Sequence, residues 1–182
     1  MSSDPSSRIR RALEPTRLAL VGFTAAQLRM ARTVALKIVQ FLAIVLTALA
    51  FLPAGAHLFS FLNKIGLTAE QYYIAQGIYR GWNLFGFVLF PAVLMNLVLT
   101  IMQRRRATAF RLALLAFLSL GATVAIFFIW TEPANRATDY WTTIPANWAA
   151  LRQQWEYSHA ASAIVAFVAL CAVTLSVLTH KE

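Results

Sequence analysis

Four long apolar runs, separated by short polar segments, dominate the hydropathy pattern of the chain. They cover about residues 34–62, 81–102, 107–130 and 159–179. Each run can form an α-helix that crosses a bilayer, which takes roughly 20 residues at about 1.5 Å of rise per residue. The apolar periodicity is helical, and none of the runs shows the short alternation of a barrel strand. The pattern predicts an all-α polytopic membrane protein, a four-transmembrane-helix up-and-down bundle.

The segments outside these runs complete the predicted organisation. Residues 1–33 form a cytoplasmic N-terminal segment, with a Ser-rich start at residues 1–7 that predicts disorder. Residues 8–32 alternate basic and apolar positions, which predicts either an amphipathic helix on the membrane surface or a partner-docking segment. Residues 34–182 form the transmembrane domain. Within it, Thr68 is placed to cap a helix before the second span, and residues 103–106 form a short basic turn.

The longest predicted connection is external and joins the third and fourth spans at about residues 131–146. Loops of this length over a compact bundle are usually either lids or disordered segments. Its aromatic residues, Tyr140 and Trp141, favour a packed lid.

Composition and charge restrict the class further. Hydrophobic residues make up 59% of the chain, charged residues 13%, and the mean hydropathy is +0.63, which is too apolar for an ordinary soluble domain. With a cytoplasmic N-terminus, that side carries twelve Lys and Arg against three Asp and Glu, whereas the opposite side carries four of each. The positive-inside rule therefore places both termini in the cytoplasm and explains the net charge of +9 without nucleic acid. We expect the protein to lie in the lipid bilayer of a bacterial inner (plasma) membrane.

The chain has a single cysteine, Cys171, so an intramolecular disulfide is excluded.

Polar residues recur at one depth of the predicted bundle. Counting about 20 residues outward from each cytoplasmic boundary reaches His57, Trp82 beside Arg80, Glu132 and His159. All five Trp and all five Tyr lie at or beyond this outer level. An anchoring belt normally occupies both interfaces, so the rings form either a belt with lid packing or the lining of a site for a flat apolar ligand.

A stripe of aromatic and polar residues leads into the last span. It consists of Trp148, Arg152, Trp155, Glu156 and His159, at relative positions 0, 4, 7, 8 and 11 on one helix face. The stripe and the polar level allow three interpretations. The first is a network of ion pairs that join an arginine, 80 or 152, to a glutamate, 132 or 156, and lock the helix ends.

The second interpretation is a metal site. Glu156 and His159 form a Glu-x-x-His pair, but di-iron carboxylate bundles need two such helices and two more carboxylates. Only a mononuclear site from His57, His159 and one carboxylate stays open, and we expect no metal and no cofactor.

The third interpretation is a site for an organic substrate. Here His159 or His57 abstracts a proton, and Arg152 or Arg80 stabilises the resulting anion. Trp148 and Trp155 stack on the substrate rings.

The motif residues resemble a known family. They are Pro133-Ala-Asn135-Arg136, Trp141, Asn147-Trp148, Leu151-Arg152, Trp155-Glu156 and His159, with Pro53-Ala-Gly-Ala56 and Tyr79-Arg80-Gly81 in the first half. This set resembles the small four-helix membrane proteins related to fungal anthrone oxygenases, over about residues 34–178. The resemblance implies a cofactor-independent oxidation of polyketide anthrones to anthraquinones, in which a base deprotonates the substrate and the carbanion reacts with oxygen. It implies roles for Asn135, Trp148, Arg152, Trp155, Glu156 and His159, whereas His57 and Ser162 depart from the family pattern.

Together these observations predict an outer-leaflet pocket for a planar hydrophobic molecule, aromatic or quinone-like. The candidate catalytic residues are His159, Arg152, His57 and Arg80, and the candidate substrate-binding residues are Trp148, Trp155, Asn135, Glu156 and Trp82. An anthrone-type oxygenase activity is the expected chemistry. The alternative is a non-catalytic membrane subunit or a lipid-binding protein, in which the motif only anchors the lid.

Overall fold

The computed structural model describes residues 5–179, with side-chain surroundings for Thr24 and residues 26–179. All regular elements in this range are helical. Four helical segments are long and apolar enough to cross a membrane, namely Ala26–Lys64, Trp82–Gln103, Ala107–Ala137 and Trp148–Leu178. This result confirms the predicted all-α bundle with four apolar helices.

The first helix, α1 (Pro5–Lys64), is continuous through both Pro15 and Pro53. It belongs to two compact units, residues 1–38 and residues 39–182. Residues 1–4 lie outside the described range, so the predicted disorder is tested only at residues 5–7, which are helical. Placement of residues 8–32 on the membrane surface stays a prediction.

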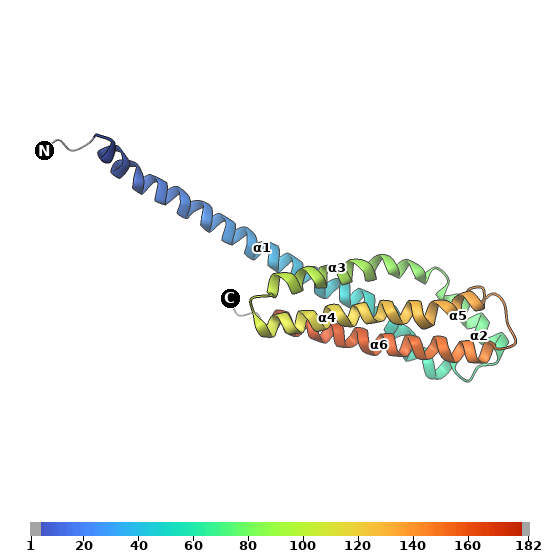
Figure 1. Ribbon diagram of the computed structural model, residues 1–182. Coiled ribbons are helices and arrows are strands. Elements are labelled where there is room, and N and C mark those ends of the chain that lie inside the picture. The colour runs from blue at the N-terminus through green and yellow to red at the C-terminus, as the bar shows by residue number, and fades with distance from the viewer. Residues whose placement is uncertain (1–4, 180–182) are drawn as a thin grey trace. The chain divides into compact units, whose positions relative to one another are not determined.

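In the second unit, α3 (Gly86–Gln103), α4 (Ala107–Ile126) and α6 (Trp148–Leu178) run side by side (Figure 1). The predicted basic turn joins α3 to α4, and the two helices are neighbours as expected. Helices α4 and α6 are neighbours, and both bury alanines, including Ala113 and Ala116 on α4 and Ala169 on α6. Small side chains allow two membrane helices to approach closely. The Ser176 hydroxyl of α6 also donates a hydrogen bond to the Ala109 carbonyl of α4, at 2.8 Å.

A short helix, α2 (Ala69–Gln76), precedes the second span. Thr68 caps it as predicted, because its Oγ1 accepts from the Gln71 N–H and its own N–H donates to Gln71 Oε1. Two 3₁₀ turns follow, η1 (Gly77–Tyr79) and η2 (Trp82–Phe85), separated by Gly81 at φ +86°. Glycine adopts this left-handed conformation without steric cost, so the chain turns sharply between Arg80 and Trp82.

The third span is longer than the apolar run indicates. After α4 the chain forms a π-helical turn, η3 (Phe127–Thr131), and continues as α5 (Glu132–Ala137). Pro133 lies in the first turn of α5, directly after the π-helical turn. The connection expected at about residues 131–146 is therefore confined to residues 138–147. As a result, Glu132 and Asn135 lie on a helix rather than in a loop.

Candidate functional site

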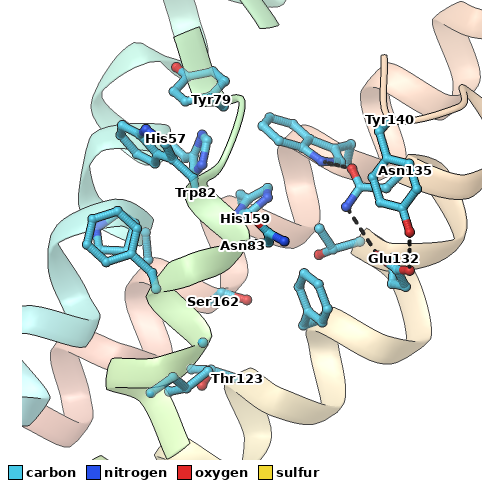
Figure 2. Close-up of a pocket in the computed structure, with 18 of the residues that line it drawn as sticks. His57, Tyr79, Trp82, Asn83, Thr123, Glu132, Asn135, Tyr140, His159 and Ser162 are labelled. Atoms are coloured by element: carbon cyan, nitrogen blue, oxygen red, sulfur yellow. Dashed lines mark hydrogen bonds between the residues drawn. The ribbon is translucent and has the colours of Figure 1, made fainter. Parts of the chain in front are cut away.

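A cavity of about 720 Å³ lies where α4 ends and α6 begins. Its deeper wall is apolar and includes Leu89, Leu120 and Ala166. Six of the nine predicted site residues line it: His57, Arg80, Trp82, Asn135, Trp155 and His159. Figure 2 shows the two histidines on the side of the cavity formed by α1 and α6, with Glu132 and Asn135 across from them.

The two histidines form the centre of the site. The rings of His57, from α1, and His159, from α6, have centroids 4.1 Å apart and planes inclined by 35°. Trp155 contacts both, with centroid distances of 4.8 Å to His57 and 4.2 Å to His159. His57 is only 4% exposed, and its Nδ1 has no hydrogen-bond partner. A buried polar atom without a partner is rare in folded proteins and marks a place for a ligand or a water molecule.

Asn135 holds two tryptophan rings at the cavity wall. Its Oδ1 accepts hydrogen bonds from Trp155 Nε1 at 2.8 Å and from Trp141 Nε1 at 3.0 Å. An indole N–H can only donate, so these two bonds fix which end of the Asn135 amide faces the rings. The predicted ligand-binding residue Asn135 thus orients Trp155 as well as lining the cavity.

The connection after α5 has an unusual backbone. Asp139, Tyr140 and Trp141 have φ values of +47°, +52° and +66°. Left-handed conformations are uncommon for residues other than glycine, and they tend to persist where surrounding structure holds them. Here Thr138 Oγ1 accepts from the Trp141 N–H at 3.1 Å, and the Asn135 carbonyl accepts from the Tyr140 N–H at 2.6 Å. The strained turn places Tyr140 and Trp141 in the cavity lining.

A buried ion pair that the sequence analysis missed lies next to the histidines. Lys64 Nζ is 2.9 Å from Glu156 Oε1, and the two side chains are 6% and 0% exposed. The Lys64 ammonium also lies over the rings of Tyr79 and Trp155, at 4.7 and 5.0 Å from their centroids. Lys64 follows His57 by seven residues, or about two helical turns, so both lie on one face of α1. This seven-residue spacing is the feature of the sequence that could have placed Lys64 beside His57.

Glu156 makes a second contact through α2. The Tyr72 hydroxyl donates to Glu156 Oε1 at 2.9 Å and accepts from Gln76 Nε2. Burial, and then the neighbouring Glu156 carboxylate, raise the pKa of Tyr72 far above its ordinary value. The hydroxyl therefore stays protonated and remains the donor of this hydrogen bond.

The ion pairs differ from those predicted. Glu156 pairs with Lys64 rather than with an arginine, and Glu132 Oε1 pairs with Arg136 Nε at 2.8 Å. Positions 132 and 136 are one turn apart on α5, so this second pair is a local one. The predicted pairing of these glutamates with Arg80 or Arg152 was wrong.

Arg152 and Trp148 do not line the cavity. Arg152 Nη1 donates to the Leu67 carbonyl at 2.7 Å, and its guanidinium lies 4.7 Å from the Trp148 ring centroid. Arg152 precedes His159 by seven residues, or about 10 Å along the helix axis. Arg152, with Trp148 against its guanidinium, links the start of α6 to Leu67 in the connection before α2. The predicted direct contact of Arg152, Trp148 and Glu156 with a ligand in this cavity is not supported by their positions.

The side chains around the two histidines do not form a metal site. Within residues 26–179, His, Cys, Asp and Glu side chains form no group of three that could hold an ion. His57 and His159 are close together, but no carboxylate in this range completes a group of three with them. The alternative of a mononuclear site from these residues therefore lacks its third ligand in this structure.

No protein family, curated protein or solved structure matches the chain. The resemblance to anthrone oxygenases stays a hypothesis that rests on the motif residues.

Proposed function

We propose that the cavity binds a planar hydrophobic molecule, aromatic or quinone-like, and that the protein oxidises it with molecular oxygen without a bound cofactor. The observation that carries this proposal is the contact of His57 with His159 in the wall of a large aromatic-lined cavity. The volume of about 720 Å³ lies within the usual range of small-molecule sites. Trp82 and Trp155, which flank the histidines, offer flat rings for stacking.

The histidine pair supplies the base that such a reaction needs. A neutral imidazole takes a proton from the acidic CH₂ group of an anthrone-type substrate. The carbanion gives its electrons to O₂, and a C–O bond forms to give a peroxide anion. The imidazolium returns its proton to give the hydroperoxide, which loses water and leaves the ketone of a quinone. The balance is one CH₂ group and one O₂ converted to one C=O group and one H₂O.

The surroundings of the pair fit this chemistry. The deeper apolar wall accommodates a hydrophobic ring system and limits the access of water to the carbanion. Asn135 fixes the Trp155 ring beside His159. We assign structural roles to Arg152 and Glu156, because Arg152 Nη1 donates to the Leu67 carbonyl and Glu156 Oε1 is bound by Lys64 and Tyr72.

Location in a bacterial plasma membrane, with both termini cytoplasmic, belongs to the same proposal. It is supported by the excess of Lys and Arg on one side of the four apolar helices. A hydrophobic substrate would then reach the cavity from the outer leaflet.

The activity is tested with anthrone as the substrate and protein reconstituted in nanodiscs. Anthraquinone formation and oxygen uptake should exceed the protein-free rate. His159→Gln and His57→Gln should each lower the rate about 100-fold or more, in line with loss of a general base. Tyr157→Phe is the control, because Tyr157 is exposed on the same helix and lies outside the cavity lining. Saturable anthraquinone binding by the histidine variants shows that they are folded. Equal rates with and without protein contradict the oxidation, and then saturable binding alone identifies a non-catalytic binding protein.

A further inference from the structure

Arg80 is a charged residue of the cavity that the proposed reaction does not use. It lies in the turn between η1 and η2, is exposed, and lines the cavity. Its guanidinium makes no hydrogen bond or ion pair with any residue between 26 and 179. The carboxylate in the lining, Glu132, is already paired with Arg136. The charge of Arg80 is therefore available to a ligand.

A second polar group without a partner lies beside it. Asn83 is three residues further on, is exposed, and also lines the cavity. Its side-chain amide has no hydrogen-bond partner within the part of the chain that the structure describes. An arginine offers a planar fork of N–H groups that matches a carboxylate, and an asparagine amide adds further donors. These two residues flank Trp82, which contacts the ring of His57.

Polarity changes between this rim and the interior. Arg80 and Asn83 are exposed, whereas Leu120 and Ala166 at the other end of the lining are buried. A ligand that matches both regions is amphiphilic, with a flat apolar body and one ionised acidic group. We infer that the cavity takes a planar aromatic acid, whose carboxylate or ionised phenol is bound by Arg80 with Asn83 beside it. The inference rests on the proposed function and names the substrate class of the same site.

The charge of Arg80 could stabilise the carbanion or bind an ionised group of the ligand, and the exposure of Arg80 distinguishes these two roles. A guanidinium that is exposed just before the second span attracts a charge that develops next to the buried His57 only weakly, because solvent outside the span screens it. A group that is already ionised stays at the hydrated rim and can form paired hydrogen bonds there. Arg80 therefore recognises the ligand rather than stabilising the carbanion. The phosphate of a phospholipid headgroup offers the same chemistry, so an experiment must separate the two sources.

The test compares two inert probes, anthraquinone-2-carboxylate and its methyl ester, by quenching of tryptophan fluorescence in zwitterionic nanodiscs. The wild type should bind the acid about tenfold more tightly than the ester, since hydrogen bonds to a charged group are worth that factor or more. Arg80→Gln should abolish this preference without changing ester binding, and Arg80→Lys should restore part of it. Arg105→Gln is the matched control, because it removes the same charge from the turn between α3 and α4.

Each outcome has a defined meaning. Equal binding of acid and ester by the wild type, or equal weakening of both by Arg80→Gln, overturns the inference but leaves the binding of planar molecules intact. Absence of saturable binding for either probe overturns the proposed function as well. Loss of the acid preference only in nanodiscs with anionic lipid supports the anion subsite and identifies a lipid headgroup as its competing occupant.

Discussion

The rings of His57 and His159 lie against each other, with centroids 4.1 Å apart, although they come from the first and the last apolar helices. Their contact requires α1 and α6 to be held in register at this level. The Lys64–Glu156 ion pair joins the same two helices about two turns further along α1. We therefore expect the stability of this end of the bundle and the geometry of the histidine pair to depend on each other.

Removal of one partner of the buried ion pair should destabilise the protein strongly. Lys64→Met leaves the Glu156 carboxylate buried without its cation, which should cost about 3–5 kcal/mol of unfolding free energy. The double variant Lys64→Met/Glu156→Leu should lose less than Lys64→Met alone, because no unpaired charge remains. Unfolding in sodium dodecyl sulfate measures these two variants and the single variant Glu156→Leu. A double variant that loses the sum of the single losses would show that the two charges do not interact.

Asn135 should be needed for the order of two tryptophan rings. Asn135→Leu removes the acceptor of Trp141 and Trp155, and each part-buried indole N–H left unpaired should cost about 1 kcal/mol or more. The near-ultraviolet circular dichroism of the tryptophans should fall. Asn135→Asp keeps an acceptor oxygen and should retain most of the signal, and Asn63→Leu, at an exposed position of α1, should leave it unchanged. A full signal in Asn135→Leu would contradict the assigned role.

Tyr72 should make stability depend on alkaline pH. Its pKa is raised in the folded state, so the stabilisation is complete below the unfolded pKa of about 10 and is lost as the pH rises above it. The wild type should exceed Tyr72→Phe in unfolding free energy at pH 8, and the difference should narrow by pH 11. Tyr157→Phe, at an exposed position, should follow the wild type at both pH values. A constant difference between wild type and Tyr72→Phe would argue against the raised pKa.

The orientation can be tested with a single new cysteine. In a Cys171→Ala background, Asp139→Cys in the connection after α5 should react with an impermeant maleimide added to intact cells. This follows from the cytoplasmic placement of both termini. A cysteine at Arg105, in the turn between α3 and α4, should react only after the membrane is opened. The reverse pattern would invert the topology.

Hydropathy was sufficient to predict the bundle, because a fixed rise per residue converts an apolar run into a membrane span. The same counting brought His57, Trp82 and His159 to one level, and the structure places all three in one cavity. Neighbouring residues on α6 point about 100° apart, however, so Glu156 faces Lys64 while Trp155 faces the cavity. Which partner a side chain meets depends on how the helices pack.

Two other features could not be predicted from the hydropathy pattern. The apolar run ends at Trp130, but Pro133 starts a further helix that carries Asn135 into the cavity wall. Lys64 is one of the four basic residues that the predicted topology places on the outer side. Only the packing of α1 against α6 shows that its ammonium is buried on Glu156.

The central claim, that this cavity holds a planar ligand, is tested most directly by filling it. Ser162 lines the cavity, whereas the adjacent Ala161 is exposed outside it, so phenylalanine at these two positions of α6 forms a matched pair. The measurement is a titration of reconstituted protein with anthraquinone, followed by tryptophan fluorescence. The account predicts saturable binding for the wild type and Ala161→Phe, and affinity at least about tenfold weaker for Ser162→Phe. Equal affinity for all three proteins, or fluorescence that never saturates, would contradict it.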